Sequence, residues 1–152
     1  RRSIYTIWKR TAAPTSMLLF DAPNREICMP KRSRTNTPLQ ALALLNEVTY
    51  VEAARALAEK MLSIESAKNS EDRLILGYRL ATGSSPNAET LSILQDGLNK
   101  RRKRFLENPE AAKSLINQGS STSRSGLDEV ELAAYTSTAN ILLNLDRVIM
   151  KN

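Results

Sequence analysis

A helix start, and the apolar periodicity that follows it, constrains the fold of this chain more than any other feature. Thr37 is a good N-cap, Pro38 suits the first helical position, and Gln40 lies where its side chain can reach back to the cap. One apolar face continues to about residue 62, through Leu39, Leu42, Leu45, Val48, Val51, Ala54, Leu57, Ala58 and Met61. Because Asn46-Glu47 interrupts the pattern, we expect either one long helix or two helices that meet at a bend.

Four further helices are predicted downstream. Ser70 is expected to cap a helix that Gly83 ends, and Ser85-Pro86 to open the next one. Asn108-Pro109 indicates a short helix, and Asp128 followed by Glu131 indicates the cap of a last helix that continues to about residue 150. The low-complexity stretch 119–126, Gly-Ser-Ser-Thr-Ser-Arg-Ser-Gly, is typical of a mobile loop.

The N-terminal residues 1–37 are predicted to contain less helix than the rest of the chain. Apolar residues at helical spacing predict a short helix within residues 3–10, and Pro14 should stop it. Met17–Phe20 is predicted to be an extended apolar segment that packs on the core. No segment alternates convincingly as a strand would, and the chain holds few aromatic residues. The sequence therefore predicts an all-α fold, an irregular bundle of about six helices with a long N-terminal loop segment.

The charge is placed unevenly. Residues 1–34 contain eight basic and two acidic residues, so the whole net charge of +6 lies there. Such a segment favours an anionic partner or an acidic surface elsewhere in a longer protein, although a solvated basic arm is as good an interpretation. We expect one helical domain over residues 1–152, with a basic arm and loop at 1–37 and a helical core at 38–152. Because the chain opens on Arg-Arg-Ser, it is expected to be a fragment of a longer protein.

Several chemistries are excluded by residue type. The chain has no histidine and a single cysteine, Cys28, so it cannot form a Ser-His-Asp triad, a Cys-His pair or the usual zinc site. No Cys-x-x-Cys-His motif is present to attach a haem, and no apolar run is long enough to span a bilayer. We therefore expect no metal site, no cofactor in this chain and no membrane span.

Six motifs in chain order resemble one family, the planctomycete-specific domain of the first type (PSD-one). They are Arg-Arg-Ser-Ile-Tyr-Thr-Ile-Trp-Lys-Arg, Phe-Asp-Ala-Pro-Asn-Arg-Glu-Ile-Cys, Arg-Thr-Asn-Thr-Pro-Leu-Gln-Ala-Leu, Val-Glu-Ala-Ala-Arg-Ala-Leu-Ala, Arg-Leu-Ala-Thr-Gly with Pro86, and Asn-Ile-Leu-Leu-Asn-Leu-Asp. The chain is similar to the C-terminal part of that domain. Where relatives often have Asn-Asp-Pro at the bend, this chain has Asn46-Glu47-Val48, which leaves a kink there open.

The resemblance implies a context but no reaction. Members of the family are exported planctomycete proteins of unknown function, which usually also carry a planctomycete cytochrome c domain. It implies a periplasmic or exported location and a haem c in another domain of the full-length protein. It supplies no catalytic residues that could be transferred to this chain.

Four residues form the most plausible reactive set: Asp21, Arg25, Glu26 and Cys28. The two acids could form an acid/base pair while Arg25 holds an anionic group. The alternative is structural, with Asp21 capping the following turn and Arg25 paired to Glu26 in a buried loop. Cys28, with no histidine to activate it, is expected to be a small buried apolar residue.

A second set is predicted to bind an anion. Arg32, Arg34 and Asn36 precede a helix N-terminus, where free N–H groups and the helix dipole favour negative charge. A sulfated or carboxylated sugar, or a haem propionate from a partner domain, would suit such a site. Pairing of Arg34 with Asp21 or Glu26 is an equally good interpretation.

Two further groups of polar residues bear on function. The run Lys100–Arg104 resembles a nucleic-acid patch, but five consecutive residues spread over all faces of a helix, so nucleic acid is an unlikely partner. Asn140, Asn144 and Asp146 are predicted to hydrogen-bond the Asp21–Asn36 loop.

Three functions follow from these observations. The preferred one is a non-catalytic helical module that packs against other domains of its own chain. The second is a contribution to an oxidoreductase or carbohydrate-active site through the 20–36 loop. The third is binding of an anion, a polysaccharide or nucleic acid.

Overall fold

The computed structural model describes residues 5–9, 13–23, 26, 28–31, 33–64, 67, 69–123 and 126–150. Within these ranges the chain forms eight α-helices and no β-sheet, which confirms the all-α prediction. The helices are α1 (Thr15–Leu19), α2 (Pro38–Asn46), α3 (Val48–Ser63), α4 (Ser70–Thr82), α5 (Ala88–Glu107), α6 (Pro109–Ile116), α7 (Glu129–Leu143) and α8 (Asp146–Ile149).

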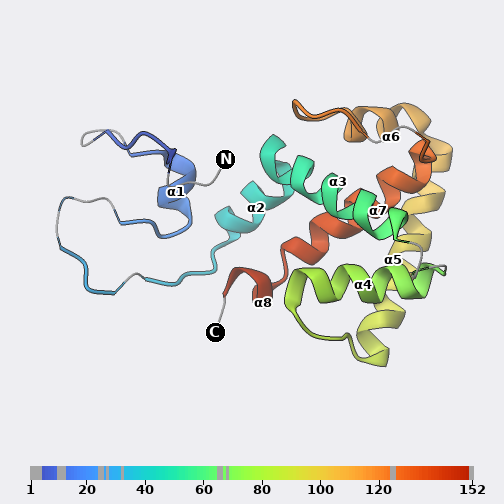
Figure 1. The fold of residues 1–152 in the computed structure, drawn as a ribbon, viewed down its shortest axis with the longest axis horizontal. Coiled ribbons are helices and arrows are strands. Elements are labelled where there is room, and N and C mark those ends of the chain that lie inside the picture. The colour runs from blue at the N-terminus through green and yellow to red at the C-terminus, as the bar shows by residue number, and fades with distance from the viewer. Residues whose placement is uncertain are drawn as a thin grey trace.

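The helices gather around α3 and α7, which run side by side through the middle of the molecule (Figure 1). Helices α4, α5 and α6 pack around this pair, whereas α1 and the long segment that follows it lie at one end (Figure 1). Helix α2 leads from that segment into the bundle, and α8 returns the chain to the same end. The predicted long N-terminal loop is therefore present, although it contains α1.

Most of the helix signals were confirmed. Thr37 accepts a hydrogen bond from the backbone amide of Gln40, whose side chain accepts one from the Thr37 amide, so the capping box is complete. Asp128 caps α7 by accepting from the amide of Glu131, and Gly83 ends α4 in the left-handed conformation, at φ 75°. Of the two alternatives for residues 38–62, the chain forms two helices, because Glu47 is extended and separates α2 from α3.

The prediction for Met17–Phe20 was wrong. These residues include most of α1, which begins when the amides of Met17 and Leu18 both donate to the carbonyl of Pro14. Of the helix expected within residues 3–10, Tyr5 has a 3₁₀ conformation and residues 6–9 are not helical, whereas residues 3, 4 and 10 lie outside the described part.

Several boundaries also differ from the prediction. Helix α4 takes Asn69 rather than Ser70 as its N-cap residue, and α5 begins two residues after Pro86, where the side chain of Asn87 caps it. Helix α7 ends at Leu143, and a separate short helix, α8, follows the extended Leu145.

Helix α7 forms the centre of the core. Every residue from Leu132 to Asn140 is buried except the partly buried Ser137. Many of the residues at the contact with α3 are alanines, which let two helix backbones approach closely. Helix α4 also approaches α3 closely at Gly77. A Cβ at this position would lie 2.5 Å from Cε of the buried Met61, so a larger residue would require Met61 to move.

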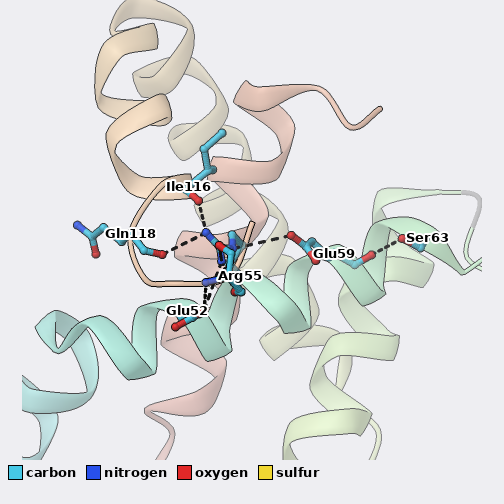
Figure 2. A network of polar contacts seen from close by, with 7 residues as sticks. Glu52, Arg55, Glu59, Ser63, Ile116 and Gln118 are labelled. Atoms are coloured by element: carbon cyan, nitrogen blue, oxygen red, sulfur yellow. Dashed lines mark hydrogen bonds and ion pairs between the residues drawn. The ribbon is translucent and has the colours of Figure 1, made fainter. Parts of the chain in front are cut away.

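Buried Arg55 ties α3 to the segment that joins α6 and α7 (Figure 2). Its guanidinium donates to the carbonyl of Ile116, to the Gln118 carbonyl at 3.1 Å, and to the carbonyl and hydroxyl of Ser121 at 2.8 and 2.6 Å. Glu52 and Glu59, one turn away on either side along α3, supply opposite charge at 3.7 and 3.8 Å. A buried charge is tolerated when hydrogen bonds and counter-charges surround it, as they do here.

Glu52 strengthens the same contact from the surface. Hydrogen bonds from the Ser121 hydroxyl, and then from its backbone amide, lower the pKa of Glu52 below its ordinary value. The carboxylate therefore favours the folded state above that ordinary value, and this contribution is lost as the pH falls through the lowered pKa. Gly119, at φ 101°, gives the carboxylate room, because a Cβ there would lie 2.7 Å from it.

Replacing Arg55 by Met tests how strongly this network holds the fold. The variant keeps the length of the side chain but leaves three buried or partly buried carbonyls without their donor. We expect the free energy of unfolding to fall by about 2–4 kcal/mol, measured by urea denaturation. Lys60→Met, an exposed position of the same helix, should change it by less than about 0.5 kcal/mol. Equal effects of the two variants would contradict the assigned role of Arg55.

Candidate functional site

The predicted site region borders a cavity at the end of the molecule where the N-terminal loop meets α8. The cavity has a volume of about 570 Å³. It is lined by Phe20, Asp21, Pro30, Lys31, Ser33, Arg34, Thr35, Gln40, Val148, Ile149 and Met150. Its wall thus joins residues more than 100 positions apart in the sequence.

Asp21 holds the two sides of the loop together. Its carboxylate accepts from the Thr35 amide at 2.7 Å, from the Thr35 hydroxyl at 2.9 Å, and from the Ser33 hydroxyl at 3.5 Å. The backbone of Asp21 has φ 59°, a left-handed conformation that Asp tolerates better than most residues. Asp21 thereby closes a loop by binding residues 12 and 14 positions further on.

Among the described residues of the reactive set, Asp21 alone lines this cavity. Asp21 lines it, Glu26 and Cys28 do not, and Arg25 lies outside the described residues. The prediction that Cys28 is buried was wrong, because the thiol is free and exposed. Residues 28–31 form an outer part of the loop in which every side chain is exposed, so no helix covers Cys28.

The predicted anion-binding residues are also divided. Arg34 lines the cavity together with Lys31, and Arg32 lies outside the described residues. Asn36 faces another partner, since its side-chain amide donates to Asp146 of α8 at 2.7 Å. The start of α2 is occupied by its own capping box, so the cationic part of the cavity consists of Lys31 and Arg34 rather than a helix N-terminus.

Gln40 is the central residue of this region, and its burial was not predicted. It is only 1% exposed, and its side-chain amide donates to the Leu19 carbonyl at 2.7 Å and to the Thr35 hydroxyl at 3.1 Å. One side chain therefore joins α1, the loop and α2. The capping box in the sequence indicated that Gln40 reaches back to Thr37, but no sequence signal indicated which other groups its amide meets.

The last helices hold α2 in place more than they hold the loop. Asn140 donates to the carbonyl of Leu45 at 3.2 Å, and Asn144 donates to that of Ala41 at 3.5 Å. The prediction that these two asparagines bind the Asp21–Asn36 loop was therefore wrong. It was right for Asp146, which accepts from Asn36.

The basic run on α5 spreads over several sides of the helix, as the sequence predicted. Arg102 pairs with Glu131 of α7 at 2.7 Å and donates to the Ser70 hydroxyl at 3.0 Å, which leaves its charge inside the bundle. Lys100, Arg101 and Arg104 lie together at a different side, beside Ser137 of α7. The basic residues of α5 therefore lie in two different environments and do not form one continuous patch.

Metal ligands do not cluster in the described residues, where no group of three or more His, Cys, Asp or Glu side chains could hold a metal ion. None of the described helices is long and apolar enough to cross a membrane.

The family match agrees with the resemblance seen in the sequence motifs. The family model PSD1, a protein of unknown function (DUF1553), matches residues 1–98, and the chain belongs to this family. The match covers the N-terminal loop, α1 to α4 and the first half of α5; the motif at residues 140–146 lies beyond it. No curated protein and no solved structure matches the chain.

Replacing Gln40 by Ala tests whether it fastens the loop. Losing donors to Leu19 and Thr35 should free the loop from α2, so trypsin should cut after Lys31 and Arg34 at least several-fold faster. Gln95→Ala is the matched control, because this partly buried glutamine of α5 makes no hydrogen bond through its side chain to any described residue. If Q40A and Q95A are cut at the same rate, the loop is held by other contacts.

Proposed function

We propose that residues 1–152 form one helical module whose function is to pack against other domains of its own polypeptide. The observation that carries this proposal is the exposed apolar face of α2. Leu39 is 60% exposed, Leu42 58% and Leu45 42%, and Val48 at the start of α3 extends the same face. The sequence pattern places these residues on the core side, so their exposure is a departure from that expectation.

The other side of α2 explains why its leucines point outward. Gln40 is buried beneath the helix, and the carbonyls of Ala41 and Leu45 accept from Asn144 and Asn140 of α7. Polar contacts therefore fix one face of α2 to the bundle and leave the leucine face uncovered. A contiguous apolar face on a surface helix is typical of a protein–protein contact.

The wider context of the proposal comes from the family resemblance. We infer an exported or periplasmic planctomycete protein with a haem c in a separate cytochrome domain. In such a protein, a partner domain that covers α2 would remove three leucine side chains from water. Complete burial of a leucine contributes roughly 1.5–3 kcal/mol.

The test compares this chain with the longer polypeptide that contains its neighbouring domains. Hydrogen exchange at the amides of residues 42–46 should be slower in the longer polypeptide, because α2 would be covered there. Leu42→Lys should remove that difference and should lower the stability of the longer polypeptide by about 1–3 kcal/mol. The same variant should change the isolated chain by less than about 0.5 kcal/mol, since the side chain is already exposed.

Leu106→Lys provides the matched control. Leu106 is 65% exposed on α5, so the variant makes the same leucine-to-lysine substitution at an exposed position outside α2. It should leave exchange at α2 unchanged in both polypeptides. Equal exchange at α2 with and without the neighbouring domains would refute the packing function.

A second function is supported by the cavity of the N-terminal loop. Lys31 and Arg34 place two positive charges on its wall, and Asp21 already accepts several hydrogen bonds from Ser33 and Thr35. A carboxylated or sulfated sugar would place its negative charge against these two cations on the cavity wall. This site would be the contribution of the chain to a carbohydrate-active or oxidoreductase domain.

Titration with trigalacturonate, followed by NMR, tests this second function. Amide signals of Ser33, Thr35 and Ile149 should shift with trigalacturonate and not with uncharged maltotriose. Arg34→Gln should weaken binding by about tenfold, the effect of losing one charge-assisted hydrogen bond. Lys60→Gln, on an exposed face of α3, should leave it unchanged. Shifts that persist in R34Q, or that maltotriose also produces, would contradict an anion-selective site.

A further inference from the structure

A second basic cavity lies between α5 and α7, on the side of the bundle formed by Gly97, Lys100, Arg101 and Arg104. These residues follow the spacing of one helix face, and Ser137 of α7 lies opposite them. The cavity has a volume of about 340 Å³. It is separate from the α2 face and from the cavity of the N-terminal loop.

Arg101 has an unusual position in this cavity. Its guanidinium folds back over its own helix, so that a Cβ at Gly97 would lie 2.6 Å from the Arg101 Nη1 atom. Burial lowers the pKa of this guanidinium. Among the described residues it has neither an ion-pair partner nor a hydrogen-bond acceptor, and the same holds for the side chains of Lys100 and Arg104. Three neighbouring cations, one of them partly desolvated, favour a negatively charged ligand.

Arg102, the next residue, differs from Arg101 because its charge is paired within the fold. It pairs with Glu131 at 2.7 Å, and its guanidinium carbon lies 5.7 Å from the centre of the Tyr135 ring. The fold has therefore supplied a carboxylate and an aromatic face to one arginine, but supplies no anion to its neighbour.

An apolar cavity continues from the basic one. It has a volume of about 430 Å³ and shares Gly97, Lys100 and Arg101 with the basic cavity. The side chains of Ile93 and Ile141 also line it. Ile93 is 65% exposed, although it lies on the wall of a cavity. Asp96 also lines this apolar cavity, one helical turn from Lys100, and does not line the basic cavity. Together the two cavities form a groove that is cationic at one end and apolar at the other.

We propose that the groove between α5 and α7 binds a small amphiphilic oxyanion. The phosphate, sulfate or carboxylate group contacts Arg101, Lys100 and Arg104 and accepts a hydrogen bond from the Ser137 hydroxyl. The apolar part of the ligand covers Ile93 and Ile141. The size of the groove is within the range of pockets that bind small molecules.

The test is a calorimetric titration of the 152-residue chain with hexyl sulfate, hexyl phosphate and hexanoate, each below its micellar concentration. At least one of them should bind with 1:1 stoichiometry, and the tightest identifies the head group. Hexyltrimethylammonium has the same tail with the opposite charge and should not bind. Inorganic sulfate, which lacks the tail, should bind at least tenfold more weakly than hexyl sulfate.

Three variants test whether the ligand binds at this groove. Arg101→Gln should weaken binding at least tenfold. Gly97→Ala should also weaken it, because the added methyl group displaces the guanidinium without removing its charge. Lys103→Gln, an exposed position of α5 outside both cavities, should change binding less than twofold and serves as the charge-matched control. Thermal unfolding of each variant checks that it is folded.

Two results would overturn the proposal. If hexyltrimethylammonium binds as tightly as the anionic ligands, the groove is merely apolar. If R101Q and K103Q weaken binding equally, the anions respond to the net charge of the chain and not to this site.

Discussion

The burial of α7 on nearly all of its sides is the constraint on which the rest of the fold depends. A helix with so little exposed surface needs neighbours around its circumference, and α3, α4, α5 and α6 provide them. Small residues make this possible, because Ala54 and Ala58 of α3 face a helix that itself contains Ala133, Ala134 and Ala139. Larger side chains at these positions would separate the two helices and open the core.

Two buried polar side chains then attach the loops to this core. Arg55 binds the carbonyls of the segment after α6, and Gln40 binds groups of α1 and of the N-terminal loop. Arg55 bonds mainly to backbone carbonyls, whereas Gln40 bonds to one carbonyl, one hydroxyl and one backbone amide. Backbone groups are available in a loop whatever its side chains are. These two loops are therefore positioned in part by hydrogen bonds from side chains of helices.

The same arrangement accounts for the surfaces on which the proposals rest. Because α2 is held by polar contacts on one side, its leucines are exposed on the other. Arg102 pairs with Glu131, whereas Arg101, on another side of α5, has no ion-pair partner among the described residues. The loop cavity has Lys31 and Arg34 on its wall, while the acidic group beside them is bound to Thr35. The three surfaces differ in chemistry: the α2 face is apolar, the loop cavity is cationic, and the groove between α5 and α7 is cationic at one end and apolar at the other.

The sequence by itself determined the all-α class, the capping box at Thr37 and most helix starts, because these depend on residues within one or two turns of each other. It also determined the family, and it excluded histidine-dependent chemistry. The exposure of Leu42 and Cys28, the burial of Gln40, and the partners of Asn140 and Asn144 were decided only by the tertiary structure. The exposure of Cys28 depends on how the loop folds. The other outcomes depend on which face of a helix meets groups about 20 to 100 residues away, and helical periodicity reports that a face is apolar but not what covers it.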